Sequence, residues 1–165
     1  MLSAETSVGA YPADAVATMA RIIMAAERDW PFVPPDGPPQ TTGGAIARAA
    51  GEVGAAVGAR ALVAFTMTGD TARRLARCRS PIPLLVFTTE SATRSQLALT
   101  WGAETFLVPP VAHTDDMVRQ VDAALRDIGR CADGDLVVIV AGSPPGTPGR
   151  TNALRVHRIG DAVES

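Results

Sequence analysis

The amino-acid sequence predicts an α/β protein, a three-layer sandwich in which helices cover both faces of a five-stranded, mostly parallel sheet. From residue 61 onward, short apolar runs alternate with helical segments, which is typical of parallel strands buried on both faces. Only a Gly/Pro-rich loop separates the last two runs, so the fifth strand is expected to run antiparallel to the fourth. An N-terminal helix precedes this sheet.

The first element is a helix over residues 12–29, because Val16, Met19 and Ala26 recur at helical spacing. Pro12 suits a first helical turn, where its missing N–H is not needed. Five prolines within residues 31–40 then exclude both a helix and a central strand. We therefore predict an N-terminal segment 1–29, a proline-rich linker 30–42 and a domain 43–165.

The domain begins with a helix rich in small residues, whose apolar positions run from Ile46 to Val57. Beyond it the pattern alternates. The predicted strands cover residues 61–66, 83–88, 105–108, 135–142 and 152–159, and the predicted helices cover 71–79, 91–100 and 114–130.

Composition excludes several classes of function. The net charge is −2 without a basic block, so no nucleic-acid partner is expected. No apolar run approaches the length of a membrane helix, and the N-terminus does not resemble a signal peptide. Cys78 and Cys131 show neither disulfide nor metal-ligand spacing and are interpreted as reduced thiols, which favours a cytoplasmic location.

All 15 basic side chains are arginine, and the sequence contains no lysine. A reaction that needs a lysine ammonium cannot be run by this chain alone. We also expect no catalytic role for His113, which stands beside helix-capping residue types, or for His157, which has no evident carboxylate partner in the sequence.

The first candidate site is the loop that follows strand 61–66 and opens a helix. It contains Thr66, Met67, Thr68, Gly69, Asp70 and Thr71. Hydroxyls, a glycine and the N–H groups of a helix start are the ingredients of a phosphate cradle. The alternative is that the threonines and the aspartate simply cap the helix. Arginines 73, 74, 77 and 79 form either a basic face near this loop or a solvated helix surface.

The second candidate site is the loop between the last two strands. Its chemistry-bearing residues are Gly142, Ser143, Gly146, Thr147, Gly149 and Arg150. Arg150 offers a planar fork to a phosphate, and the glycines permit unusual backbone angles. The alternative is a surface hairpin turn with a solvated arginine.

These motifs, in this order, resemble the pyruvate kinase family. The N-terminal run MLSAET (1–6), followed by Gly9, Tyr11 and Pro12, is similar to the segment that leaves the last strand and enters the last helix of that family's catalytic barrel. The loop 66–71 resembles its effector phosphate loop, and the pattern G-x-x-x-G-x-x-G-x-T-N (142–152) resembles its flexible effector loop. The match is to the C-terminal regulatory domain, preceded by a remnant of the barrel over 1–29, and the composition suggests an actinobacterial-like source.

The resemblance implies a place in glycolysis. Members transfer phosphoryl between phosphoenolpyruvate and ADP with Mg²⁺ and K⁺, in a barrel whose catalytic lysine and metal ligands lie upstream of Met1. We therefore expect no cofactor in this chain and no activity by the chain alone. In the intact family Ser3, Glu5 and Thr6 lie near the nucleotide, although Val8 replaces the lysine of many relatives.

The resemblance also implies an allosteric effector, and two departures narrow its class. Asp70 stands where certain relatives have a basic residue, and the segment between the third and fourth strands lacks the Trp and Arg that some relatives use for a second phosphate. A hexose monophosphate or AMP is expected rather than a bisphosphate.

Three functions remain open from the sequence. The chain is a regulatory and oligomerisation part of a pyruvate kinase that self-associates through its last strand, with His157 included, and neighbouring helices. Alternatively, it becomes active when joined to a separately encoded barrel. Finally, it is a stand-alone sugar-phosphate or nucleotide binder.

Overall fold

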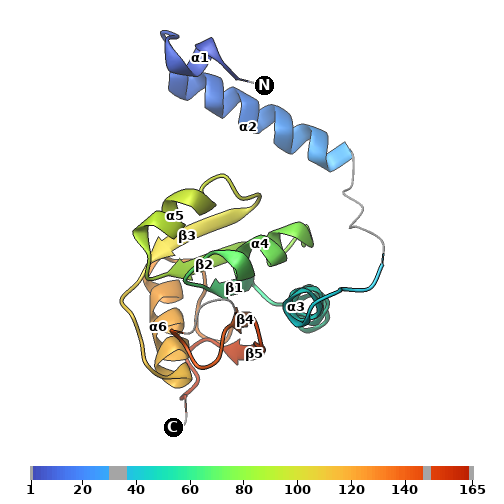
Figure 1. The fold of residues 1–165 in the computed structure, drawn as a ribbon, viewed down its shortest axis with the longest axis vertical. Helices are drawn as coiled ribbons and strands as arrows, with labels where there is room; N and C mark the ends of the chain where they lie inside the picture. Colours follow the sequence, from blue (N-terminus) through green and yellow to red (C-terminus); the bar gives the residue numbers. More distant parts are fainter. Residues whose placement is uncertain (1, 30–36, 147–149, 164–165) are drawn as a thin grey trace. The chain divides into compact units, whose positions relative to one another are not determined.

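The computed structural model describes residues 2–29, 37–146 and 150–163 (Figure 1). They belong to two compact units, Met1–Pro35 and Asp36–Ser165, each of which is described by itself. Residues 30–36 of the predicted linker lie outside the described residues. The predicted α/β sandwich, with its five-stranded sheet and antiparallel last strand, is confirmed in the second unit.

The first unit consists of helices α1 (Ala4–Ser7) and α2 (Pro12–Asp29). Helix α2 has the predicted bounds. The short α1 was not predicted, because a single turn is too short to show helical periodicity in the sequence. The hydroxyls of Thr6 and Ser7 donate to the Ser3 carbonyl within this turn, at 3.0 and 3.1 Å. Val16 and Ile22 of α2 are 47% and 63% exposed, so this helix presents an apolar surface.

Helix α3 (Thr42–Val57) opens the second unit and begins at the last residue of the predicted linker. The Thr41 hydroxyl explains this start, since it accepts from the Gly44 N–H at 3.1 Å and caps the helix. Gly54 packs against the sheet so closely that a Cβ there would approach Leu62 Cδ2 to 2.9 Å.

The sheet has the order β3-β2-β1-β4-β5, in which only the β4–β5 pair is antiparallel. Its strands are β1 (Ala61–Phe65), β2 (Leu84–Thr88), β3 (Ala103–Leu107), β4 (Leu136–Ala141) and β5 (Ala153–Arg158). Strand β3 begins two residues before its predicted start. It lies at the edge of the sheet, where Glu104 is tolerated and pairs with Arg130 at 2.6 Å.

Helices α4 (Asp70–Arg77), α5 (Ser91–Leu97) and α6 (Thr114–Asp127) complete the layers (Figure 1). Alternate residues of β1 enter two cores. Val63 and Phe65 pack with α6, whereas Leu62 and Ala64 pack with α3, α4 and α5. Among the described residues, no helix combines the length and apolar character needed to cross a bilayer.

The strand order decides where a ligand can bind. The chain leaves β1 for β2 and β3 on one side, then crosses to β4 on the other side of β1. Phe65 and Ala141 are register partners at the carboxyl ends of β1 and β4. The two candidate loops therefore start next to each other, at the switch point where open α/β sheets bind ligands.

Candidate functional site

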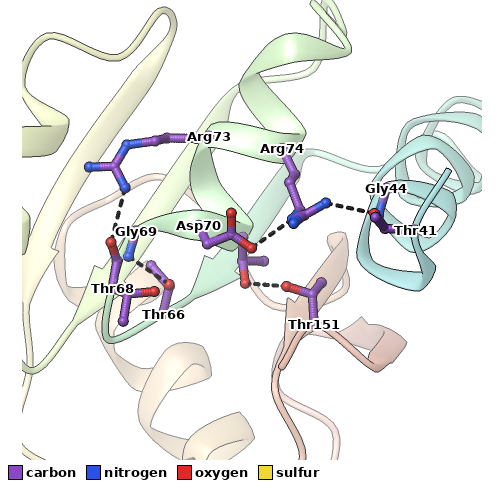
Figure 2. Close-up of polar contacts among 10 residues, drawn as sticks. Thr41, Gly44, Thr66, Thr68, Gly69, Asp70, Arg73, Arg74 and Thr151 are labelled. Carbon is purple, nitrogen blue, oxygen red and sulfur yellow. Dashed lines mark hydrogen bonds and ion pairs between the residues drawn. The ribbon is translucent and has the colours of Figure 1, made fainter. Parts of the chain in front are cut away.

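The loop after β1 is held in one conformation by hydrogen bonds from outside it. Gly69 adopts a left-handed backbone (φ 82°) at the N-cap of α4, and its N–H donates to the Thr66 hydroxyl at 3.0 Å. Thr93 of α5 donates to the Met67 carbonyl at 2.6 Å. Arg73 of α4 donates to the Thr68 carbonyl at 3.0 Å (Figure 2). Both carbonyls are thereby engaged, and the first-turn N–H groups of α4 have no acceptor within the helix.

The alternative capping role of this loop applies only in part. The Thr66 hydroxyl accepts from the Gly69 N–H, but Gly69, the N-cap residue of α4, has no side chain with which to cap the helix. The arginines of α4 also differ from one another in their surroundings. Arg73 and Arg74 are bonded within the site region, and Arg77 is solvated at the end of α4.

The two ends of the loop after β4 are held together by hydrogen bonds. The Asn152 side chain accepts from the Ser143 N–H at 2.7 Å and donates to the Ser143 carbonyl at 2.8 Å. A Cβ on Gly142 would collide with the Arg150 carbonyl oxygen, so the two ends of the loop approach each other only because residue 142 is a glycine. Thr147 and Gly149 lie outside the described residues.

The two loops meet in one hollow of about 30 Å³. The buried hydroxyls of Thr71 and Thr151 join them at 2.7 Å. Of the predicted residues, the hollow is lined by Thr66, Met67, Thr68, Asp70 and Thr71 from the first loop and by Gly142, Gly146 and Arg150 from the second. Gly69 and Ser143 shape the loops without lining it. Thr151 and Pro145 also line the hollow but were not among the predicted site residues. Thr151 is the threonine of the G-x-x-x-G-x-x-G-x-T-N pattern, whereas no residue pattern marks Pro145.

The hollow is electrostatically balanced and opens beside a larger cavity. Asp70 and Arg150 are the charged side chains that line it. A second cavity of about 400 Å³ is bordered by the same Asp70, Arg150 and Thr151, together with Arg74 and the start of α3. Arg74 Nε lies 2.6 Å from Asp70 Oδ2, and Arg74 Nη1 donates to Thr41 Oγ1 at 2.8 Å (Figure 2).

The N-terminal candidates Ser3, Glu5 and Thr6 lie in the first unit. The Ser3 N–H donates to the Glu5 carboxylate at 2.9 Å. Backbone N–H groups, first that of Glu5 itself and then that of Ser3, lower the pKa of the Glu5 carboxyl.

His157 has a partner that the sequence did not reveal. Its Nε2 lies 2.8 Å from Oδ2 of Asp122, and its side chain is only 3% exposed, so it faces α6 and is not available on the surface of β5. Burial of Asp122 acts to raise its pKa, but hydrogen bonds from Gly160 N and His157, and the charge of Arg126, outweigh burial and lower it. His113 is exposed at the N-cap of α6.

The described residues contain no group of three or more His, Cys, Asp or Glu side chains that could hold a metal ion.

Comparison with known proteins identifies the family of this chain. The family model described as pyruvate kinase, alpha/beta domain, matches residues 44–157. The chain belongs to the pyruvate kinase family. A pyruvate kinase of Mycobacterium tuberculosis is 57% identical over 162 residues, and one of Corynebacterium glutamicum is 53% identical over 161 residues. Each alignment covers 98% of this chain and 34% of the relative. The expected likeness to actinobacterial pyruvate kinases is confirmed.

A crystal structure of a pyruvate kinase from Cryptosporidium parvum superposes with a TM-score of 0.79 at 26% identity, covering 96% of this chain and 32% of that one. The chain spans about a third of the length of the pyruvate kinases it matches.

Proposed function

We propose that this chain is the regulatory and oligomerisation part of a pyruvate kinase, and that the hollow between its two loops holds the phosphate of an allosteric effector. The observation that carries the proposal is the junction of the loops 66–71 and 142–150 at the switch point of the sheet, closed by the Thr71–Thr151 hydrogen bond. A ligand in the hollow would contact both loops.

The chemistry of the hollow suits a phosphate. Helix α4 starts there and offers unpaired N–H groups at the positive end of its dipole. Threonine hydroxyls and the Arg150 guanidinium add further donors. The hollow has room for little more than a phosphate group, so the rest of an effector would lie in the adjoining cavity of about 400 Å³. With Arg150 as the single cation lining the hollow, a monophosphate such as a hexose monophosphate or AMP fits better than a bisphosphate.

Thermal unfolding with and without ligand tests the proposal. Glucose 6-phosphate or AMP at ten times its Kd should stabilise the chain by about 1.4 kcal/mol and raise Tm by about 3–6 °C. Thr68→Ala should weaken binding at least about tenfold, because a hydrogen bond to a charged group is lost. Thr100→Ala, beyond α5 and outside the hollow, is the matched control and should bind like wild type. If neither ligand at millimolar concentration shifts Tm, the proposal is refuted.

The family reaction, phosphoryl transfer with Mg²⁺ and K⁺ in the cytoplasm, would belong to the longer polypeptide. We expect no activity from this chain alone because it contains no lysine. The apolar surface of α2, where Ile22 and Met24 are 63% and 57% exposed, supports packing against the catalytic barrel. Pyruvate formation on adding a barrel polypeptide from a relative would show that the two parts can combine into an enzyme.

Self-association is proposed through β5 and the neighbouring helices. Strand β5 is an edge strand whose Val156 is 40% exposed, and such an edge can pair with a second copy. Sedimentation should show an oligomer that Val156→Asp dissociates, whereas Leu99→Asp, at an exposed position that follows α5 near the opposite edge strand β3, should not. A monomeric wild type would contradict this part of the proposal.

A stand-alone binder of sugar phosphates or nucleotides is the second candidate. It is favoured by one observation, the compactness of the Asp36–Ser165 unit with its own two-sided core. Tight effector binding by a monomer that does not interact with any barrel polypeptide would support it.

A further inference from the structure

We propose that Asp70 selects the ligand of this site, because its carboxylate accepts hydrogen bonds from hydroxyl groups beside the phosphate and disfavours phosphates that carry none. The inference rests on the proposed function and assigns the class of ligand, namely hydroxyl-bearing monophosphates. It starts from a contradiction, since an anion site is not expected to be lined by a carboxylate.

Asp70 occupies the boundary between the two cavities. It lines the hollow of about 30 Å³, where the phosphate is proposed to bind, and also the adjoining cavity of about 400 Å³. Any group attached to the bound phosphate and extending into the larger cavity passes this side chain. Asp70 is therefore placed to contact the first atoms beyond the phosphate.

Arg74 orients the carboxylate and offsets part of its charge. Arg74 Nε binds Oδ2 of Asp70 at 2.6 Å, and Arg74 is itself held by the capping hydroxyl of Thr41 at 2.8 Å (Figure 2). Oδ1 receives no hydrogen bond from any of the described residues. The Asp70 side chain is 45% exposed and lines both cavities, so a ligand can reach it.

This arrangement treats two kinds of phosphate differently. For a bare phosphate monoester, the carboxylate contributes only repulsion, which Arg74 reduces but does not abolish. A sugar hydroxyl donates to Oδ1, and a hydrogen bond to a charged acceptor is stronger than one between neutral groups. The same side chain thus lowers affinity for one class and raises it for the other.

The test measures the sign of the effect with two kinds of probe on the full chain. Glucose 6-phosphate and AMP carry hydroxyls, whereas ethyl phosphate has the same phosphomonoester and none. Dissociation constants come from NMR chemical-shift titrations. Asp70→Ala should weaken binding of the hydroxyl-bearing probe that the wild type prefers by about tenfold and tighten binding of ethyl phosphate about threefold.

Two further variants complete the design. Asp70→Asn keeps an oxygen acceptor without the charge, so it should tighten ethyl phosphate as Asp70→Ala does, while losing less than about threefold for the hydroxyl-bearing probe. Asp116→Ala is the matched control, because Asp116 also lies in a first helical turn and pairs with an arginine, Arg119, at 2.7 Å. It should leave both affinities unchanged.

The outcomes separate the two proposals. Opposite shifts for the two kinds of probe support the selection by Asp70. Equal shifts in the same direction, with wild-type binding intact, overturn it and leave the phosphate site standing. Wild-type chain that binds none of the three probes overturns both.

Discussion

Asp122 is predicted to be the side chain whose removal most destabilises the C-terminal end of the domain. Its carboxylate is 7% exposed and accepts from three donors, namely Gly160 N at 2.8 Å, His157 Nε2 at 2.8 Å and Arg126 Nη2 at 2.7 Å. These bonds tie β5 and the turn after it to α6. We therefore consider the variant Asp122→Ala.

The size of the effect follows from what the substitution leaves behind. His157 and the backbone N–H of Gly160 would lose their acceptor, and a buried donor without a partner costs about 1–3 kcal/mol. Arg126 is 46% exposed and can be hydrated, so it adds little. The expected loss is about 2–5 kcal/mol, or about 5–15 °C in Tm.

Urea and thermal unfolding followed by circular dichroism measure this loss. Asp116→Ala on the same helix is the matched control: its ion pair with Arg119 is 46% exposed on both sides, and its removal should cost less than about 1 kcal/mol. If the free energies of unfolding of the two variants differ by less than about 0.5 kcal/mol, the reasoning is wrong.

The pH dependence of the stability difference between wild type and Asp122→Ala is a second test. The pKa of Asp122 is lowered in the folded protein, so ionised Asp122 stabilises the fold at every pH above its ordinary pKa of about 4. That contribution is lost as the pH falls through the lowered folded-state pKa. The stability gap between wild type and Asp122→Ala should therefore be widest above about pH 4 and narrow in more acidic solution.

Two further predictions concern glycine and cysteine positions. Gly142→Ala should abolish phosphate binding and destabilise the fold by about 1–3 kcal/mol, because the new Cβ would collide with the Arg150 carbonyl oxygen. Gly51→Ala in α3 is the control, because its Cβ would meet Ser80 Cβ at an ordinary distance of 4.0 Å. It should be neutral or stabilise the fold by up to about 1 kcal/mol. Equal unfolding curves and equal titrations for the two variants would contradict this. Burial raises the pKa of both Cys78 and Cys131, so a thiol reagent at neutral pH should label the native chain far more slowly than the urea-unfolded chain. If the native chain is labelled as fast as the unfolded chain, the thiols of Cys78 and Cys131 are not protected by burial and the prediction is wrong.

Much of the fold was predictable because it depends on local patterns. Continuous apolar runs identified β1, β2 and β4, which are buried on both faces. The start of the edge strand β3 was predicted two residues late, at Thr105, because Glu104 is charged and is tolerated only through its position at the sheet edge.

The site was predictable only loop by loop. The residue types of 66–71 indicate a phosphate cradle whatever the topology, but the approach of Thr71 to Thr151 spans 80 positions and depends on the strand order. The same limit hid the Asp122–His157 pair, which joins a helix to a strand 35 positions later. The sequence does not separate Arg74 from the other arginines of its helix, which form either a basic face near the loop or a solvated surface, because only its distance from Asp70 distinguishes it.

The anchoring of the β1–α4 loop through its backbone carbonyls has a consequence for how this site can evolve. Thr93 and Arg73 fix the loop by binding the carbonyls of residues 67 and 68, which every amino acid possesses. Side chains at positions 67, 68 and 70 can therefore be exchanged by mutation while the path of the chain is retained. Under the proposed function, a single substitution at one of these positions would change which ligand the loop accepts without changing its backbone conformation.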